Sequence, residues 1–178
     1  KGDIMTGLIH VYEGDGKGKT TAAVGLAVRC AGSGRKVLFS QFLKSDTSNE
    51  LKVLKNIENI ELYTKKSNFG FTFNMTDEEK ILAKEFFTNH LKEIIHLAIE
   101  KKVDLVVMDE VIDAYNLNMV EHDVLTDFLK SRPKNLEVVM TGRNPKDEIV
   151  ELADYLTHFQ KVKHPFDKGI RARVGIEM

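Results

Sequence analysis

The sequence has a single cysteine, Cys30, so no disulfide can form within the chain. That count fits a reducing compartment such as the cytoplasm. The formal net charge is −1, which gives no general attraction to nucleic acid or to an acidic membrane surface. No apolar run approaches the roughly 18 residues that a membrane span needs. We therefore expect a cytoplasmic protein that has neither nucleic acid nor a membrane as a partner.

The chain also lacks internal repeats, low-complexity tracts and linker-like stretches. Its 178 residues are enough for one domain with a sizeable core, so we expect a single domain over residues 1–178. Residues 1–6 contain no basic region followed by an apolar run, and no signal peptide is expected there. The six histidines show no metal-ligand spacing, and the sequence offers no Ser-His-Asp arrangement or obvious general base.

Strand and helix patterns alternate along the chain. The expected strands are residues 8–12, 37–43, 60–63, 105–108, 136–140 and 155–159. Helices are expected at residues 20–30, from a capping box at 76–79 onward, around 120–129, and from Asn144 as N-cap. Such alternation predicts an α/β fold with a mainly parallel sheet covered by helices on both faces.

Residues 13–21, Glu-Gly-Asp-Gly-Lys-Gly-Lys-Thr-Thr, join the first predicted strand to the first predicted helix. Three glycines let the backbone curl around an anion, and the helix N-terminus adds partial positive charge. Lys19 can reach phosphate oxygens, and the Thr20 hydroxyl can bind Mg²⁺. The segment therefore predicts an ATP-binding P-loop, and with it a fold like that of the P-loop NTPases, although its leading glycine comes one place later than in the general pattern. The alternative is a flexible turn with surface lysines.

Two carboxylates, Asp109 and Glu110, end an apolar strand. In P-loop proteins an acid at this place holds Mg²⁺ directly or through water. Because strand residues alternate faces, we expect the two side chains to point in different directions. One would then serve the metal, and the other would orient a water molecule or cap the backbone. The alternative is a solvated strand end.

Arg143 follows another predicted strand, where a guanidinium can bind a triphosphate bidentately. The alternative is a surface arginine in a turn. Residues 68–73 hold three phenylalanines around a glycine, which either cover a flat apolar ligand or pack into the core. The basic run at residues 161–173 either meets phosphates or an acidic partner, or forms a solvated face, and we favour the solvated face.

Several motifs together resemble one enzyme family. They are Gly-Asp-Gly-Lys-Gly-Lys-Thr-Thr-Ala-Ala at 14–23, Gln-Phe-Leu-Lys at 41–44, Gly-Phe-Thr-Phe at 70–73, Met-Asp-Glu at 108–110, Arg-Pro at 132–133, Thr-Gly-Arg at 141–143, Ala-Asp at 153–154 and Gly-Ile-Glu at 175–177. In this order they resemble the P-loop corrinoid adenosyltransferases over nearly the whole chain. The shortened phosphate loop is itself typical of that family.

The resemblance implies a reaction in which a Co(I) corrinoid attacks C5′ of ATP, forming a cobalt–carbon bond and releasing triphosphate. It implies ATP and either cob(I)alamin or a corrinoid precursor as substrates, Mg²⁺ or Mn²⁺ as the metal, a flavin-type reductase as electron donor, and a homodimer. The product would serve adenosylcobalamin biosynthesis or salvage. Co(I) is already a strong nucleophile, so the protein has to place C5′ and stabilise the leaving triphosphate.

The resemblance also implies roles for individual residues. Lys19 and Arg143 would be catalytic, because they stabilise the leaving group. Thr20, Glu110 and Asp109 would hold the metal ion. Corrinoid-binding residues would be Phe71 and Phe73, which exclude the lower axial ligand of cobalt; the family often has Trp at the place of Phe73. The nucleotide would be bound by Gly14, Asp15, Gly16, Lys17, Gly18, Lys19, Thr20, Thr21 and Arg143.

Two other functions fit the same residues. A P-loop kinase or ATPase that uses the γ-phosphate predicts ADP as the product. A nucleotide-binding module without chemistry predicts tight ATP binding with no turnover under any reductant.

Overall fold

The computed structural model describes residues 6–44, 48–67, 69 and 75–177. Its centre is a six-stranded sheet with the strand order β3-β2-β4-β5-β1-β6, in which every neighbouring pair is parallel. The strands are β1 (Ile9–Glu13), β2 (Val37–Gln41), β3 (Ile60–Leu62), β4 (Leu105–Asp109), β5 (Glu137–Thr141) and β6 (Tyr155–His158). The predicted α/β fold with a parallel sheet is confirmed.

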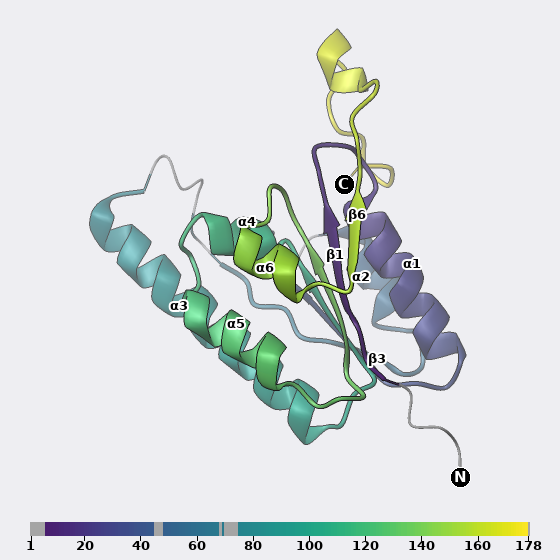
Figure 1. Cartoon of the computed structure of the whole chain (residues 1–178). Helices are drawn as coiled ribbons and strands as arrows, with labels where there is room; N and C mark the ends of the chain where they lie inside the picture. Colours follow the sequence, from purple (N-terminus) through teal and green to yellow (C-terminus); the bar gives the residue numbers. More distant parts are fainter. Residues whose placement is uncertain (1–5, 45–47, 68, 70–74, 178) are drawn as a thin grey trace.

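Helices cover both faces of this sheet, also as predicted. Figure 1 shows α1 and α2 on one face, and α3, α4, α5 and α6 on the other. The helices are α1 (Lys19–Gly32), α2 (Asn49–Leu54), α3 (Asp77–Glu100), α4 (Val111–Asn116), α5 (His122–Ser131) and α6 (Asp147–Leu152), with a short 3₁₀ helix, η2 (Pro165–Lys168). No helix in the described ranges is long and apolar enough to cross a bilayer.

Alternate residues of the central strands pack into two separate hydrophobic cores. In β4, Leu105 and Val107 belong to the core beneath α1 and α2. Val106 and Met108 belong to the core beneath α3 to α6. All four side chains are buried. Burial on both faces explains why this strand reads as a continuous apolar run instead of an alternating one.

Most predicted boundaries differ from the structure by one or two residues, and two of these differences have a clear local cause. Strand β2 ends at Gln41, because Leu43 has a left-handed backbone with φ of 54°. Helix α6 has Lys146 as its N-cap, so the predicted cap at Asn144 is wrong. Asn144 instead has φ of 47°, and its carbonyl oxygen accepts a hydrogen bond from Asn116 Nδ2 at 2.9 Å. The turn that these contacts hold delays the start of the helix.

The predicted functional motifs meet at one edge of the sheet. The phosphate loop follows β1, the acidic pair ends β4, and Arg143 follows β5. These three strands are neighbours in the order β4-β5-β1. Because all of them run in the same direction, their carboxyl ends lie side by side. Figure 1 shows the C-terminal segment, residues 159–177, rising beyond this same edge.

Candidate functional site

The phosphate loop is shaped by its glycines and by the chain that follows β6. Gly14 and Gly18 have φ of 113° and 122°, values that side chains with a Cβ rarely adopt. The N–H of Gly16 donates to the carbonyl oxygen of Phe159 at 2.6 Å. A Cβ added at Gly14 or Gly16 would lie 2.5 Å from that oxygen. The glycines therefore allow the loop to curl, and they also allow the chain just after β6 to approach it closely.

Lys19 begins α1, and its side chain folds back over the loop. Its Nζ donates to the carbonyl oxygen of Gly14 at 2.6 Å and to that of Gly16 at 2.9 Å. Partial burial lowers the pKa of this ammonium, and the positive charge of Arg143 adds to the decrease. The ammonium is thus held within the loop, where it can meet a phosphate group.

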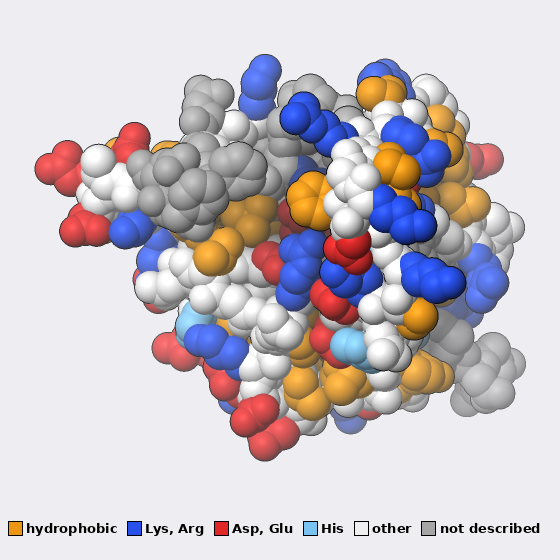
Figure 2. Space-filling model, turned by 90° about the horizontal axis from the view of Figure 1, so that it is seen from above, with side chains coloured by type: hydrophobic (Ala, Val, Ile, Leu, Met, Phe, Trp, Pro, Cys, Tyr) orange, Lys and Arg blue, Asp and Glu red, His pale blue; other side chains and the backbone are white. Residues whose placement is uncertain are grey.

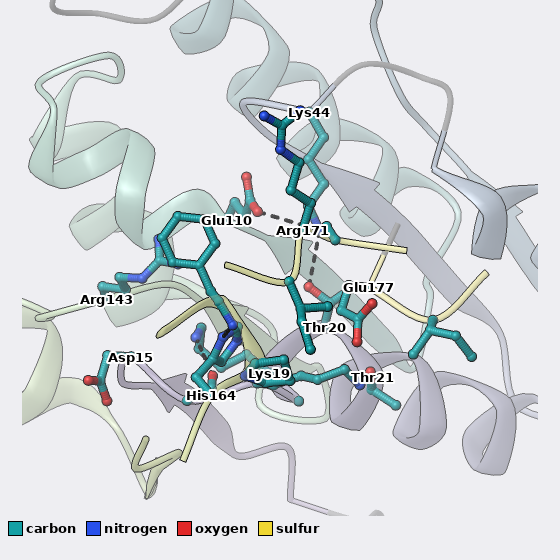
Figure 3. A pocket seen from close by; sticks show the side chains of 18 residues that line it. Asp15, Lys19, Thr20, Thr21, Lys44, Glu110, Arg143, His164, Arg171 and Glu177 are labelled. Atoms are coloured by element: carbon teal, nitrogen blue, oxygen red, sulfur yellow. Dashed lines mark hydrogen bonds and ion pairs between the residues drawn. The ribbon is translucent and has the colours of Figure 1, made fainter. Parts of the chain in front are cut away.

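The ammonium of Lys44 lies among the three residues predicted to hold a metal ion. Its Nζ is 2.7 Å from Asp109 Oδ2, 3.1 Å from Thr20 Oγ1 and 3.5 Å from Glu110 Oε1. Figure 3 marks the contacts of Lys44 with Thr20 and Glu110. The structure therefore brings Thr20, Asp109 and Glu110 together, as the sequence predicted, and it places a cation at their centre.

Asp109 is a fully buried carboxylate with several donors around it. Its Oδ1 accepts hydrogen bonds from Thr20 Oγ1 at 2.9 Å and from Thr141 Oγ1 at 2.7 Å. Its Oδ2 accepts a longer one from Gln41 Nε2 at 3.3 Å, besides the Lys44 ammonium. A buried carboxylate needs such partners because desolvation of the charge is costly. The alternative of a solvated strand end is excluded for this residue.

Glu110 lies just beyond β4, in a left-handed conformation with φ of 62°. Its N–H donates to Thr141 Oγ1 at 2.8 Å. The side chains of Asp109 and Glu110 were expected to point in different directions, but both contact Lys44. The left-handed conformation at Glu110 ends the alternation of side chains along the strand, and this brings the two carboxylates to the same ammonium. Burial raises the pKa of the Glu110 carboxyl to about 7, against the opposing effect of the Lys44 charge.

Arg143 occupies an open position after β5. Its side chain is 60% exposed, and its Nη1 is 4.0 Å from Asp113 Oδ1. Gly142 precedes it with φ of 155°, and a Cβ there would lie 2.6 Å from Ile112 Cβ. That glycine lets the turn pack closely against α4. Arg143 is thus a turn arginine whose loosely held guanidinium remains accessible to an anion.

These residues surround one pocket of about 310 Å³. The C-terminal segment forms its second wall, and Figure 3 shows His164, Arg171 and Glu177 at the pocket. Lys and Arg side chains gather on this side of the molecule in Figure 2. The lining residues are Asp15, Gly16, Lys17, Gly18, Lys19, Thr20, Thr21, Lys44, Glu110, Arg143, His164, Pro165, Phe166, Ile170, Arg171, Ala172, Ile176 and Glu177.

Comparison with known proteins identifies the family of this chain. Residues 5–178 match the family model described as ATP:corrinoid adenosyltransferase BtuR/CobO/CobP. The chain belongs to the ATP:corrinoid adenosyltransferase family. The family and the enzyme class predicted from the sequence are therefore confirmed.

Curated relatives agree with the family match. The chain is 32% identical over 171 residues to the corrinoid adenosyltransferase of Escherichia coli K12, covering 96% of this chain and 85% of that protein. It is 33% identical over 172 residues to the corrinoid adenosyltransferase CobA of Salmonella typhimurium, with the same two coverages. The corrinoid adenosyltransferase of Pseudomonas aeruginosa is 33% identical over 173 residues, covering 96% of this chain and 83% of that protein.

Two solved structures have a similar fold and a distant sequence. A KaiC-like protein from Pyrococcus horikoshii has a TM-score of 0.56 at 14% identity, covering 89% of this chain and 75% of that one. ATPases 2 and 3 of EssC from Geobacillus thermodenitrificans have a TM-score of 0.53 at 14% identity, covering 97% of this chain and 35% of that one. At this identity the likeness shows the fold alone.

Most nucleotide-binding residues predicted for this family member line the pocket. Gly14 lies in the loop without lining it, and Asp109 is buried behind it. Phe71 and Phe73, the predicted corrinoid-binding residues, lie outside the described residues. Their neighbour Phe69 packs against Phe86 and Phe87, with ring centroids 5.7 and 6.3 Å apart. For Phe69, that contact agrees with core packing, which was one of the two alternatives left open for this aromatic segment.

Sequence reasoning missed Lys44 and the C-terminal wall. Lys44 closes the Gln-Phe-Leu-Lys motif just beyond β2, at the carboxyl edge of the sheet, and this position was a usable signal. The Lys and Arg side chains of the run at residues 161–173 are exposed, as favoured, yet Arg171 and the half-buried His164 line the pocket. Glu177 is held by Arg173, whose guanidinium lowers the pKa of the Glu177 carboxyl to about 2.

Proposed function

We propose that this enzyme transfers the 5′-deoxyadenosyl group of ATP to the Co(I) centre of a corrinoid, while the phosphate loop holds the departing triphosphate. The observation that supports it most is the concentration of cations around the loop. Lys17, Lys19, Lys44, Arg143 and Arg171 all line one pocket. A pocket with five cationic side chains suits a ligand that leaves as a polyanion.

The proposed reaction needs the two substrates to be positioned and the charge of the leaving triphosphate to be stabilised, and it needs no proton transfer. Cobalt donates an electron pair to C5′, the bond between C5′ and O5′ breaks, and triphosphate leaves with that bonding pair. No proton moves in this step, which agrees with a sequence that offers no obvious general base. Lys19 and Arg143 are the catalytic residues in this account, because they face the phosphates whose charge increases as the bond breaks.

A divalent cation, Mg²⁺ or Mn²⁺, fits the cluster of Thr20, Asp109 and Glu110. The fit is supported by Lys44, whose ammonium is a cation already lying among their oxygens. Among the described residues no group of three or more His, Cys, Asp or Glu could hold a metal by itself. That agrees with Mg²⁺, which takes one or two carboxylates and completes its shell with substrate phosphates and water. When bound, the ion would neutralise charge on the triphosphate.

The corrinoid side of the reaction is proposed from the family resemblance. Phe71 and Phe73 would lie against the corrinoid and exclude its lower axial ligand, which eases reduction of Co(II) to Co(I). A flavin-type reductase would supply the electron. We propose further that the enzyme works in the cytoplasm as a homodimer, on cob(I)alamin or an early corrinoid precursor.

An anaerobic assay tests the proposed transfer. The protein is mixed with ATP, Mg²⁺ and chemically reduced cob(I)alamin, with the Escherichia coli relative as a positive control, and the visible spectrum is followed. A light-sensitive alkylcobalamin is the expected product. An unchanged spectrum beside an active control contradicts the proposal and returns the chain to the kinase or ATPase interpretation.

A further inference from the structure

Lys44 differs from the other lysines of the pocket in having two acidic partners. Its Nζ is within 4 Å of both Asp109 and Glu110, and its side chain is 25% exposed. The ammonium lies 2.7 Å from Asp109 Oδ2 and 3.5 Å from Glu110 Oε1. It therefore has an ion-pair partner in each of the two carboxylates.

The position of this ammonium overlaps the place of a metal ion. A magnesium ion lies about 2.0–2.1 Å from each oxygen that binds it. The Lys44 Nζ is 3.1 Å from Thr20 Oγ1 and 2.7 Å from Asp109 Oδ2, on the same oxygens. Two cations cannot share so small a space, because their repulsion in a partly buried site is strong. Binding of either one requires the other to leave.

A neighbouring cavity offers space for the Lys44 side chain when its ammonium is displaced. Lys44 lines the pocket of the phosphate loop, and it also lines a neighbouring cavity bounded by Asn49, Glu50 and Val53. Four rotatable carbons connect the ammonium to the backbone, so it can swing without movement of β2. A metal that enters with its nucleotide would bring phosphate oxygens into this pocket as new anionic partners for the ammonium.

We propose that Lys44 occupies the metal site of the free enzyme and is displaced onto the triphosphate when the metal enters with the nucleotide. This inference rests on the proposed function, since it assumes the same metal site. Lys44 is then a positioning residue that keeps Asp109 and Glu110 paired in the free enzyme. The displacement makes binding of metal alone weak and binding of metal with ATP strong, so the two enter together.

Binding of Mn²⁺ to the nucleotide-free protein tests this inference without any corrinoid. The signal of free Mn²⁺ in electron paramagnetic resonance gives the dissociation constant. Lys44→Met, which removes the charge and keeps the length, is expected to bind Mn²⁺ roughly tenfold more tightly than the wild type or better, because a competing cation is lost. Lys52→Met is the matched control, since the Lys52 ammonium donates to Asn49 Oδ1, and it should bind as the wild type does.

An unchanged or weaker affinity for Mn²⁺ in Lys44→Met contradicts the inference. Lys44→Gln provides a second variant, with the same expectation, should Lys44→Met fold poorly. The wild type gives an independent measurement, in which the ammonium resonance of Lys44 must shift when Mg²⁺ and a non-reacting ATP analogue are added together. A resonance that stays unchanged also contradicts the inference. Because none of these readouts needs cobalt, a failed transfer assay leaves the result on Lys44 standing, and the reverse holds too.

Discussion

At the scale of the single residue, Lys19 connects the loop geometry to the proposed chemistry. Its ammonium lies against two loop carbonyl oxygens and lines the pocket. Lys19→Ala is expected to lower the rate of adenosyl transfer on the order of 10²-fold or more, because it removes a charge that stabilises the leaving group. The initial rate of the anaerobic assay measures this. A near-normal rate would remove Lys19 from the mechanism, and Lys36→Ala, an exposed change, serves as the control.

His90 gives a residue-scale prediction about pH and stability. It is buried against Ser40, with its ring stacked on Tyr63, and burial lowers its pKa to about 4, with the Lys65 charge adding to the decrease. The native state then binds fewer protons than the unfolded state between pH 6.5 and about 4. The free energy of unfolding therefore falls as pH is lowered through this window, by about 3 kcal/mol at most from this group.

Urea unfolding at several pH values measures the contribution of His90. His90→Gln removes the titration, so its stability should decline less steeply between pH 6.5 and 4.5 than that of the wild type. The comparison of slopes holds even if the variant is less stable throughout. His96→Gln, an exposed change on the same helix, is the control for replacing a histidine by glutamine. Identical slopes for His90→Gln and the wild type would refute the assignment.

At this scale, the sequence predicted which residues lie together where the type of residue and its place in an element were linked in the chain. Thr20 and Asp109 were predicted because a loop before a helix and an acid after a strand are recognisable locally. Lys44 was not predicted, because its proposed role depends on a contact with Asp109, which ends the neighbouring strand β4. The αL turn at Glu110 was missed for a similar reason, since the close packing of Thr141 beside it sets that geometry.

At the scale of elements, the loop between β1 and α1 depends on the neighbouring end of β6. Gly14→Ala places a Cβ 2.5 Å from the carbonyl oxygen of Phe159 and at a φ of 113°. We expect a loss of stability of roughly 1–3 kcal/mol together with weaker ATP binding, because the loop must distort.

Gly25→Ala is the matched control for that change. Gly25 lies inside α1 with no atom near its missing Cβ. Alanine there should stabilise the helix by about 1 kcal/mol and leave ATP binding unchanged. Thermal unfolding and equilibrium titration with ATP measure both effects. A Gly14→Ala protein with normal stability and affinity would mean that the contact between the loop and β6 is not needed.

Element prediction succeeded for the strands and the long helices, and it missed two short helices. Helix α3 and its capping box follow from local pattern, and Thr76 and Glu79 exchange both capping hydrogen bonds. Helices α2 and α4 are six residues each, too short for a helical period to repeat. The start of α6 was misplaced because Asn116, from a different helix, fixes the backbone turn at Asn144.

At the scale of the whole molecule, the C-terminal segment covers the pocket without joining the cores. Among the described residues beyond Ile149, none is buried. Removal of residues 164–178 should therefore leave the sheet folded, with little change in melting temperature. We expect the Michaelis constant for ATP to rise roughly tenfold or more, because one wall of the pocket is lost. A truncated enzyme with an unchanged Michaelis constant would contradict the role given to this wall.

The sequence predicted the parallel sheet and its helices, but it did not predict that the C-terminal segment covers the pocket. Alternating strands and helices were enough for a parallel sheet with ligands at its carboxyl edge. The return of residues 164–177 over the phosphate loop left no local pattern, because it depends on contacts such as that of the Lys161 N–H with Asp15 Oδ1 at 3.1 Å. In a sequence, a run of basic residues that borders a pocket has the same pattern as one that only faces solvent.

The fate of the phosphate chain of ATP tests the central claim most directly. Phosphorus NMR of a completed anaerobic reaction separates inorganic triphosphate from ADP and phosphate. Our account predicts triphosphate in an amount equal to the adenosylated corrinoid, because the bond that breaks is the one between C5′ and O5′. ADP as the main product would mean that the loop presents the γ-phosphate, and it would contradict the account.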